Sequence, residues 1–104
     1  MTKDEILRLH TLSEDEQEKI LIDNKILKSL HFKLVGCKVY ESLADCAFRL
    51  RDEVSNNKFW HCAIEVISML IDPERQRHPM SVMFYAKPIH WIQAALLEKR
   101  EKGE

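Results

Sequence analysis

The sequence contains very little glycine and proline, with two and three residues in a chain of 104. All-β sandwiches and barrels need a turn about every eight to twelve residues, and these two residue types build many of those turns. Their scarcity argues against an all-β fold. It also leaves Gly36 and Gly103 as the only glycines for a phosphate-binding loop, which excludes the usual nucleotide-binding fingerprints.

Cysteine is also scarce, and its spacing is uninformative for metal binding. The three cysteines are Cys37, Cys46 and Cys62, an odd number without a C-x-x-C pair. This pattern is weak support for a zinc site or a disulfide. We expect reduced cysteines that pack as small hydrophobic residues, as is usual in a cytosolic protein.

Long apolar runs and an excess of one charge are missing too. No stretch approaches the roughly 18 apolar residues of a membrane-spanning helix. The start "MTKDEILRLH" carries charge where a signal peptide needs an apolar region. We therefore expect a cytoplasmic protein without membrane contact. Sixteen Lys and Arg against 17 Asp and Glu give a net charge of −1, unlike the basic balance of a dedicated nucleic-acid binder.

Two segments carry strong helical patterns. The apolar fraction of 45% is sufficient for the core of a single domain over residues 1–104. In residues 42–56, which begin with "SLADCAFRLRDEV", apolar residues recur at the spacing of one helix face. Residues 58–72 are apolar around most of a helix, with one narrow polar line, so we expect this helix to be the central, most enclosed one. That line consists of His61, Glu65, Ser68 and Asp72.

Helix signals also occur at both ends of the chain. Ser13 and Glu16 form a capping-box pattern that begins a helix towards Leu30, interrupted at Asp23-Asn24, so one bent helix or two short ones are expected. Pro88 is suited to the first position of a last helix. We predict that 42–56 and 58–72 pack as neighbours and that the Pro88 helix packs against them through Trp91.

Two segments remain ambiguous. The alternation in "HFKLVGCKVYE" fits two short strands, but we favour the end of a helix that stops at Gly36. The segment "MSVMFYA" is either a helical turn or an extended connector. The predicted fold class is therefore mainly α, a small bundle of four to five helices. A short extended or hairpin segment near 32–40 is the alternative for that stretch.

Few residues are arranged for catalysis. His61 and Glu65 lie one helical turn apart and could supply two metal ligands, but no motif supplies a third or fourth. His90 could act as a general base, yet no nucleophile or carboxylate is tied to it, and a hydrogen bond to neighbouring backbone is the favoured interpretation. We expect no catalytic residue, no cofactor and no metal. The alternative is a small metal-dependent hydrolase that uses His61, Glu65 and His90.

Aromatic and basic side chains favour a binding role. Arginine and aromatic residues are the usual energetic centres of protein interfaces. We expect a non-enzymatic protein that binds a protein partner, or a second copy of the same chain. The candidate residues are Trp60, Arg75, Arg77, His78, Phe84 and Tyr85. A DNA-binding regulator is the alternative, with the Arg75–His78 loop and the lysines between Lys25 and Lys38 as its contacts. Acidic residues on both central helices make it the less favoured one.

The segments "SLADCAFRLRDEV" and "KPIHWIQAALLEK" resemble a pattern in small uncharacterised accessory proteins of tailed phages and prophages. In those proteins an A-D-x-A-F-x-x-R-D-E-like helix precedes a closing P-I-H-W-I-x-A-A-L segment. The resemblance covers about residues 42–100 and matches the middle poorly. The matching positions are Ala44, Asp45, Ala47, Phe48, Arg51, Asp52, Pro88, Ile89, His90, Trp91 and Ala94 to Leu96. It implies a phage-encoded protein that binds a host or phage protein, for instance as an inhibitor, and brings no assigned activity.

Overall fold

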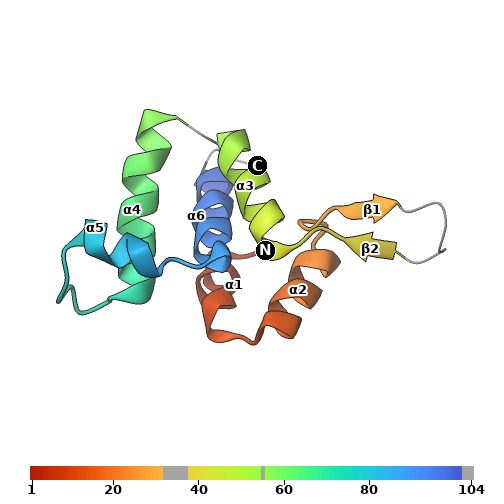
Figure 1. The fold of residues 1–104 in the computed structure, drawn as a ribbon, viewed down its shortest axis with the longest axis horizontal. Helices are drawn as coiled ribbons and strands as arrows, with labels where there is room; N and C mark the ends of the chain where they lie inside the picture. The colour runs from red at the N-terminus through yellow and green to blue at the C-terminus, as the bar shows by residue number, and fades with distance from the viewer. Residues whose placement is uncertain (32–37, 55, 102–104) are drawn as a thin grey trace.

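The computed structural model describes residues 1–31, 38–54 and 56–101, and its fold is mainly helical, as predicted (Figure 1). None of the helices in these ranges is both long enough and apolar enough to cross a bilayer. The elements in chain order are α1 (Lys3–Arg8), the 3-10 helix η1 (Leu9–Thr11), α2 (Glu14–Asp23), β1 (Ser29–His31), β2 (Lys38–Tyr40), α3 (Leu43–Val54), α4 (Asn57–Ile71), α5 (Pro79–Val82), the 3-10 helix η2 (Met83–Tyr85) and α6 (Pro88–Glu101).

The central helix is α6, which begins at Pro88 as predicted. In Figure 1 it lies between α3 and α4, and it packs most extensively on α3, then on α4 and α1. Its buried positions run around the whole circumference and include Ile92, Gln93 and Ala95, each with 0% exposure. A helix enclosed on all sides needs neighbours on all sides. The other elements are arranged around this one.

The prediction that residues 58–72 form the most enclosed helix is wrong. Helix α4 lies at one side of the molecule, and its neighbours are α6, α5 and η2. Its outer positions Trp60, His61 and Glu65 are exposed, whereas Ser68 of the predicted polar line is buried. The prediction that 42–56 and 58–72 pack as a pair is also wrong, because α3 and α4 form no extensive interface and α6 lies between them.

The contact of α6 with α4 through Trp91 is confirmed. The rings of Trp91 and Trp60 meet edge to face, with centroids 5.6 Å apart and an interplanar angle of 70°. On the α3 side, the core that the two helices share contains the buried small residues Cys46, Ala47 and Ala95, which suit close packing. Aromatic anchoring on one side and small residues on the other thus place α6 between its two neighbours.

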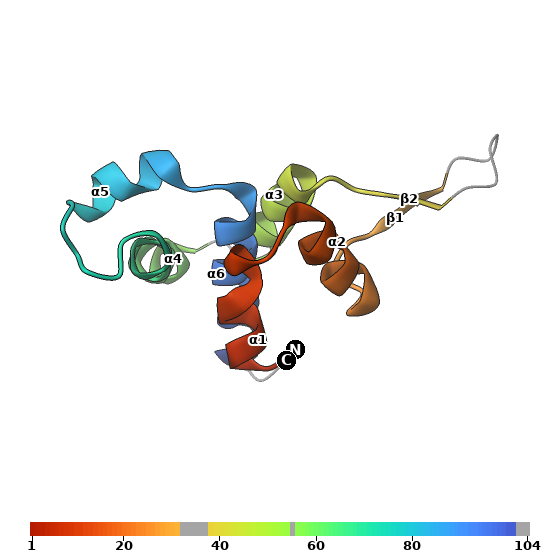
Figure 2. The ribbon, with the colours of Figure 1, turned by 90° about the horizontal axis from the view of Figure 1, so that it is seen from below.

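The N-terminal segment forms a helix that we did not predict. Thr2 and Glu5 make a complete capping box at the start of α1, which stabilises a helix of only six residues. Ile6 and Leu9 are buried. The carbonyl oxygen of Ile6 accepts a hydrogen bond of 2.7 Å from Nε2 of Gln93, so α1 is joined to the middle of α6. Local capping and this long-range hydrogen bond together explain why α1 packs against α6 (Figure 2).

Helix α2 begins as predicted but ends earlier than Leu30. The Ser13 hydroxyl accepts a hydrogen bond from the Glu16 N–H, which is the expected cap. The helix ends at Asp23, and Lys25 has a φ of 60°, a left-handed conformation that turns the chain. The N–H groups of Ile26 and Leu27 then donate to the carbonyl oxygen of Leu21. This reversal brings Leu27 into the core, where it is 4% exposed.

The described residues of the ambiguous segment include strand residues at 31 and 38–40 and not the helix end that we favoured; strands β1 and β2 together are called the hairpin. Strands β1 and β2 pair antiparallel, with Leu30 opposite Val39 and Ser29 opposite Tyr40. Gly36, the predicted helix stop, lies outside the described residues. The predicted helix end is therefore wrong for residues 38–40, and the alternative prediction of an extended segment is confirmed for them. The hairpin extends from one end of the molecule, whose dimensions are 49 × 27 × 24 Å (Figure 1).

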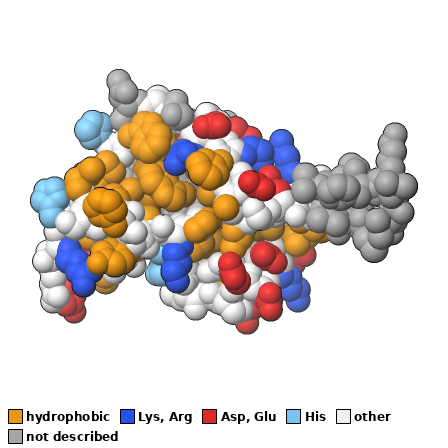
Figure 3. All heavy atoms as spheres, viewed as in Figure 1, with side chains coloured by type: hydrophobic (Ala, Val, Ile, Leu, Met, Phe, Trp, Pro, Cys, Tyr) orange, Lys and Arg blue, Asp and Glu red, His pale blue; other side chains and the backbone are white. Residues whose placement is uncertain are grey.

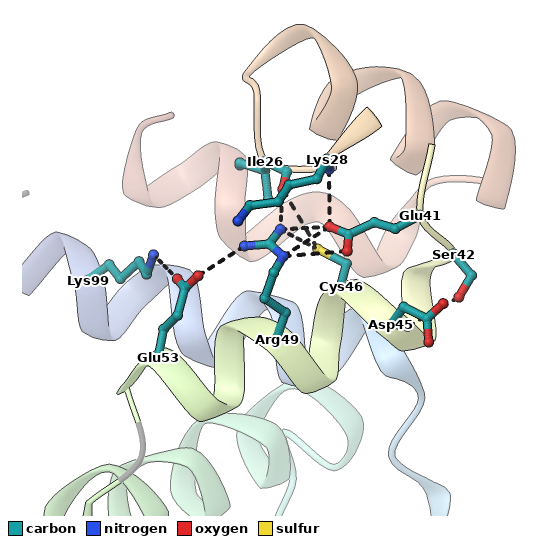
Figure 4. A network of polar contacts seen from close by, with 9 residues as sticks. All are labelled: Ile26, Lys28, Glu41, Ser42, Asp45, Cys46, Arg49, Glu53 and Lys99. Carbon is teal, nitrogen blue, oxygen red and sulfur yellow. Dashed lines mark hydrogen bonds and ion pairs between the residues drawn. The ribbon is translucent and has the colours of Figure 1, made fainter. Parts of the chain in front are cut away.

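Arg49 joins the hairpin to α3 (Figure 4). Its Nη2 lies 2.6 Å from Oε1 of Glu41, just after β2, and 2.6 Å from the carbonyl oxygen of Ile26. Its Nη1 lies 3.1 Å from Oε1 of Glu53, whose other oxygen accepts from Lys99 of α6. Burial raises the pKa of Glu41, but hydrogen bonds from Arg49 and Lys28 outweigh it, so the net shift is downwards. One guanidinium thus connects four segments of the chain.

We predict that Arg49→Met lowers the free energy of unfolding by about 2 kcal/mol, because it leaves the carboxylate of Glu41, whose side chain is only 9% exposed, without its charged partner. Urea denaturation at pH 7 measures this loss. Arg75→Met, the same change in the exposed loop after α4, is the matched control and should change stability by less than about 0.5 kcal/mol. Equal effects of the two substitutions would contradict the structural role of Arg49.

Candidate partner-binding surface

Arg51 of α3 lies among three aromatic rings from three helices. Its Cζ is 4.6 Å from the ring centroid of Phe48, 5.5 Å from that of Trp91 and 5.6 Å from that of Trp60. Phe48 and Arg51 are three residues apart, so both lie on the same side of α3. Trp60 and Trp91 come from the first turns of α4 and α6. We call these four residues the Arg51 cluster.

The Arg51 cluster is accessible and has a hollow beside it. Phe48 is 57% exposed, and Arg51 and Trp91 are half-buried. The hollow has a volume of about 150 Å³ and exists because small side chains form its walls. It is lined by Ala44, Ala47, Phe48, Arg51, Ala86, Pro88 and Trp91. Within the described ranges no carboxylate lies within ion-pair distance of Arg51, so its guanidinium contacts rings only.

A second group of exposed aromatic residues follows α4. The segment 80–87, which was ambiguous in the sequence, is helical, with α5 followed by η2. It exposes Tyr85 and Phe84, the latter by 89%. The Cζ of Arg77 lies 5.2 Å from the ring centroid of Tyr85, a second cation–π pair. The backbone N–H of Arg77 donates to Oδ2 of Asp72 over 2.8 Å, which ties this loop to the end of α4.

The two groups share one face of the molecule. Figure 3 shows hydrophobic side chains gathered over α3, α4 and α5, with basic side chains among them. Most acidic side chains visible in this view lie on the other half, over α2 and the far part of α3. Figure 2 agrees, since α3 and α5 lie on the same side of α6. We call this surface the aromatic face. We define it as the Arg51 cluster together with the exposed or ring-contacting residues Arg77, Phe84 and Tyr85 of the second group.

The structure places four of the six predicted partner-binding residues on the aromatic face: Trp60, Arg77, Phe84 and Tyr85. His78 has a local structural role, because its Nδ1 accepts the Met80 N–H at the start of α5. Arg75 is exposed, with a left-handed φ of 54°.

Sequence analysis did not select Phe48, Arg51 or Trp91 for this surface. The available signal was a phenylalanine on the charged side of an amphipathic helix, three residues before an arginine.

The residues proposed for a metal-dependent hydrolase do not form a metal site with one another. His61 and Glu65 are exposed on the outer side of α4, whereas His90 is buried in α6. Among the residues that the structure describes, no three His, Cys, Asp or Glu side chains could hold a metal ion together. Burial, followed by the nearby Glu41 carboxylate, raises the pKa of the Cys46 thiol to about 11, so it is protonated and unreactive near neutral pH.

The residues considered for DNA binding are also spread out. Helices α3 and α4 have α6 between them and do not pack together as a helix-turn-helix pair. The loop with Arg75 and Arg77 lies at the α4–α5 end of the molecule, whereas Lys25 and Lys28 lie next to the hairpin (Figure 1). The side chains of Lys33 and Lys38 are outside the described part. The basic residues that the structure describes therefore do not form one continuous surface for DNA.

His90 makes the backbone hydrogen bond that we favoured. Its Nδ1 accepts the Lys87 N–H over 2.9 Å, and the side chain is 8% exposed. Burial, then the nearby charges of His10 and Lys87, lower the pKa of His90 to about 4. The ring is therefore neutral at pH 7, with its proton on Nε2. In this state it is a hydrogen-bond donor at Nε2 and no general base.

We predict that His90 weakens the fold in mild acid. Between pH 6.5 and about 4, His90 is protonated in the unfolded chain but remains neutral in the folded chain. The free energy of unfolding therefore falls as the pH falls through this window. The loss should reach roughly 2–3 kcal/mol, because one pKa unit corresponds to about 1.4 kcal/mol and solvent screens part of the shift. Urea denaturation from pH 7 to 4 measures it.

His90→Asn keeps an acceptor near the Lys87 N–H but cannot titrate, so this part of the pH dependence should disappear. His61→Asn, in an exposed position on α4, is the control and should leave it in place. An unchanged pH profile in His90→Asn would show that other groups cause the acid sensitivity.

Comparison with models of known protein families finds no match, and comparisons with curated proteins and with solved structures find no significant similarity. The aromatic face is accordingly identified from its own geometry and chemistry.

Proposed function

We propose that this chain is a non-enzymatic binding protein of the cytosol that docks on a partner protein through its aromatic face. The observation that carries the proposal is the Arg51 guanidinium, stacked among three rings at an accessible surface. Tryptophan, tyrosine and arginine dominate the energetic centres of protein interfaces. An exposed apolar area of this kind on a small protein is typical of an interaction site.

The chemistry of the aromatic face specifies a complementary surface. Arg51 and Arg77 both lie against rings, and neither has a carboxylate partner within the described residues. A guanidinium held in this way can still form a bidentate pair with a carboxylate from another molecule. The small hollow beside Arg51 has room for one apolar side chain. The proposed partner therefore presents apolar side chains with acidic residues beside them.

The resemblance to phage and prophage accessory proteins suggests the class of partner. Such a protein would bind a host or phage protein and change its activity by covering a surface, for instance as an inhibitor. A second copy of this chain is the other occupant to consider, because an apolar face of this kind can also close a symmetric dimer. The experiment below separates the two.

A photo-crosslinking amino acid placed at Phe48 or Phe84 should give a crosslinked product in cells that encode this chain. Both positions lie on the aromatic face, so both should capture the same protein, identified by mass spectrometry. The control position is Glu16, exposed on α2, which should give little or none of it. Capture of the same chain would identify a homodimer. Equal products from all three positions, or none from Phe48 and Phe84, would contradict the proposal.

With the captured partner purified, Arg51→Met should weaken binding at least about tenfold, the loss expected for an arginine at the centre of an interface. Arg75→Met removes the same charge outside the aromatic face and should change the affinity less than about twofold. Calorimetric titration measures both, and thermal unfolding checks that Arg51→Met remains folded. Equal affinities for the two variants would mean that the Arg51 cluster is not the binding site.

A further inference from the structure

A pocket of about 560 Å³ lies where η1 and the start of α2 meet the start of α6. Figure 2 shows the segment between α1 and α2 passing close to this end of α6. Both polar and apolar side chains form its walls. They are His10, Leu12, Glu14, Gln17, Leu43, Lys87, Pro88, Ile89 and His90. The aromatic face uses none of the polar ones.

His90 presents an N–H group to this pocket. Its side chain is more than nine-tenths buried and lines the pocket, while its Nδ1 accepts the Lys87 N–H. The proton of the neutral ring is therefore on Nε2. Among the described residues no acceptor is recorded for Nε2, and this atom is not one of the enclosed atoms without a partner, so it is accessible from the pocket. An accessible N–H in a pocket can donate to water or to an acceptor of a ligand.

His10 has the same tautomer for a different reason. Its Nδ1 lies 3.0 Å from Nε2 of Gln93, and this amide nitrogen also donates to the carbonyl oxygen of Ile6. Turning the amide group of Gln93 around would place its oxygen against the carbonyl oxygen of Ile6, so the amide keeps this orientation. Nδ1 of His10 must then accept, which puts its proton on Nε2. The rings of His10 and His90 lie 5.9 Å apart, centroid to centroid.

The pocket thus combines two imidazole N–H groups with the ammonium group of Lys87. Metal binding does not fit these tautomers, since a ligating imidazole nitrogen must be unprotonated and both Nδ1 atoms are already hydrogen-bonded. The donors suit the oxygens of an anion, which accept hydrogen bonds from several directions. Among the described residues that line the pocket, Glu14 is the only one with a carboxylate, and it is exposed at the start of α2.

We propose that this pocket binds a small molecule through an oxyanion, a carboxylate or a phosphate group, held by Nε2–H of His10 and of His90 and by the ammonium group of Lys87. The apolar part of such a molecule would contact Leu12, Leu43 and Ile89. Gln93 is a positioning residue, because it fixes the tautomer of His10 without lining the pocket. This site is independent of the proposed partner binding, and either can fail without the other.

The test is a titration of the ¹⁵N-labelled protein at pH 7 with inorganic phosphate and, separately, with acetate. The side-chain nitrogen signals of His10 and His90 are followed by NMR, and sodium chloride of equal ionic strength is the reference. We expect saturable shifts of both histidines with at least one of the two anions, in the millimolar range. Preference for phosphate or for acetate then distinguishes the two groups. Shifts that do not saturate, or that chloride reproduces, would overturn the proposal.

Two exposed charges make the test specific. Lys87→Gln should weaken binding of the preferred anion by about threefold or more, and Glu14→Gln should strengthen it, because each changes one charge at the pocket. Lys58→Gln removes the same charge from an exposed position at the start of α4 and should have little effect. Equal weakening by Lys87→Gln and Lys58→Gln would show a general effect of net charge and would overturn the site.

Discussion

The structure depends on the enclosure of α6. Its buried positions run around the whole helix, so no single neighbour can cover it. Helices α3 and α4 pack on two sides, and α1 packs on a third. Gln93 is fully buried in the middle of α6, and its amide nitrogen donates to the carbonyl oxygen of Ile6, while its amide oxygen has no partner among the described residues. This hydrogen bond joins the N-terminal helix to the C-terminal one, where the two helices pack.

The first turn of α6 also contributes to both candidate sites. Consecutive residues on a helix point about 100° apart. Trp91 therefore joins the ring contacts of the Arg51 cluster, while His90, one residue earlier, lines the pocket beside η1. Pro88 begins the helix at a defined residue and so fixes both directions. A shift of this helix by one residue would move Trp91 out of the Arg51 cluster and His90 out of the pocket together, so the geometry of both candidate sites depends on the same packing.

Two arginines of α3 have contrasting environments. Arg49 donates hydrogen bonds to Glu41, Glu53 and a backbone carbonyl oxygen, so few of its N–H groups remain for another molecule. Arg51 has only aromatic rings around it, and rings orient a guanidinium without neutralising its charge. Two arginines two residues apart on one helix thus have different surroundings, acidic and carbonyl groups for Arg49 and aromatic rings for Arg51.

The sequence by itself determined what is local. Helical periodicity identified α3 and α4, Ser13 and Pro88 marked two helix starts, and the low glycine content excluded an all-β fold. Only the tertiary structure decided which helix is central, since an apolar surface on α4 indicates burial but not how many neighbours provide it. It also decided the conformation of residues 38–40, because the short sequence pattern there was compatible with a strand as well as with the helix end that we favoured. The meeting of Arg51 with Trp60 and Trp91, and of His10 with Gln93 and His90, joins residues far apart in the chain. Periodicity assigns a residue to a face of its helix, and only packing determines what that face touches.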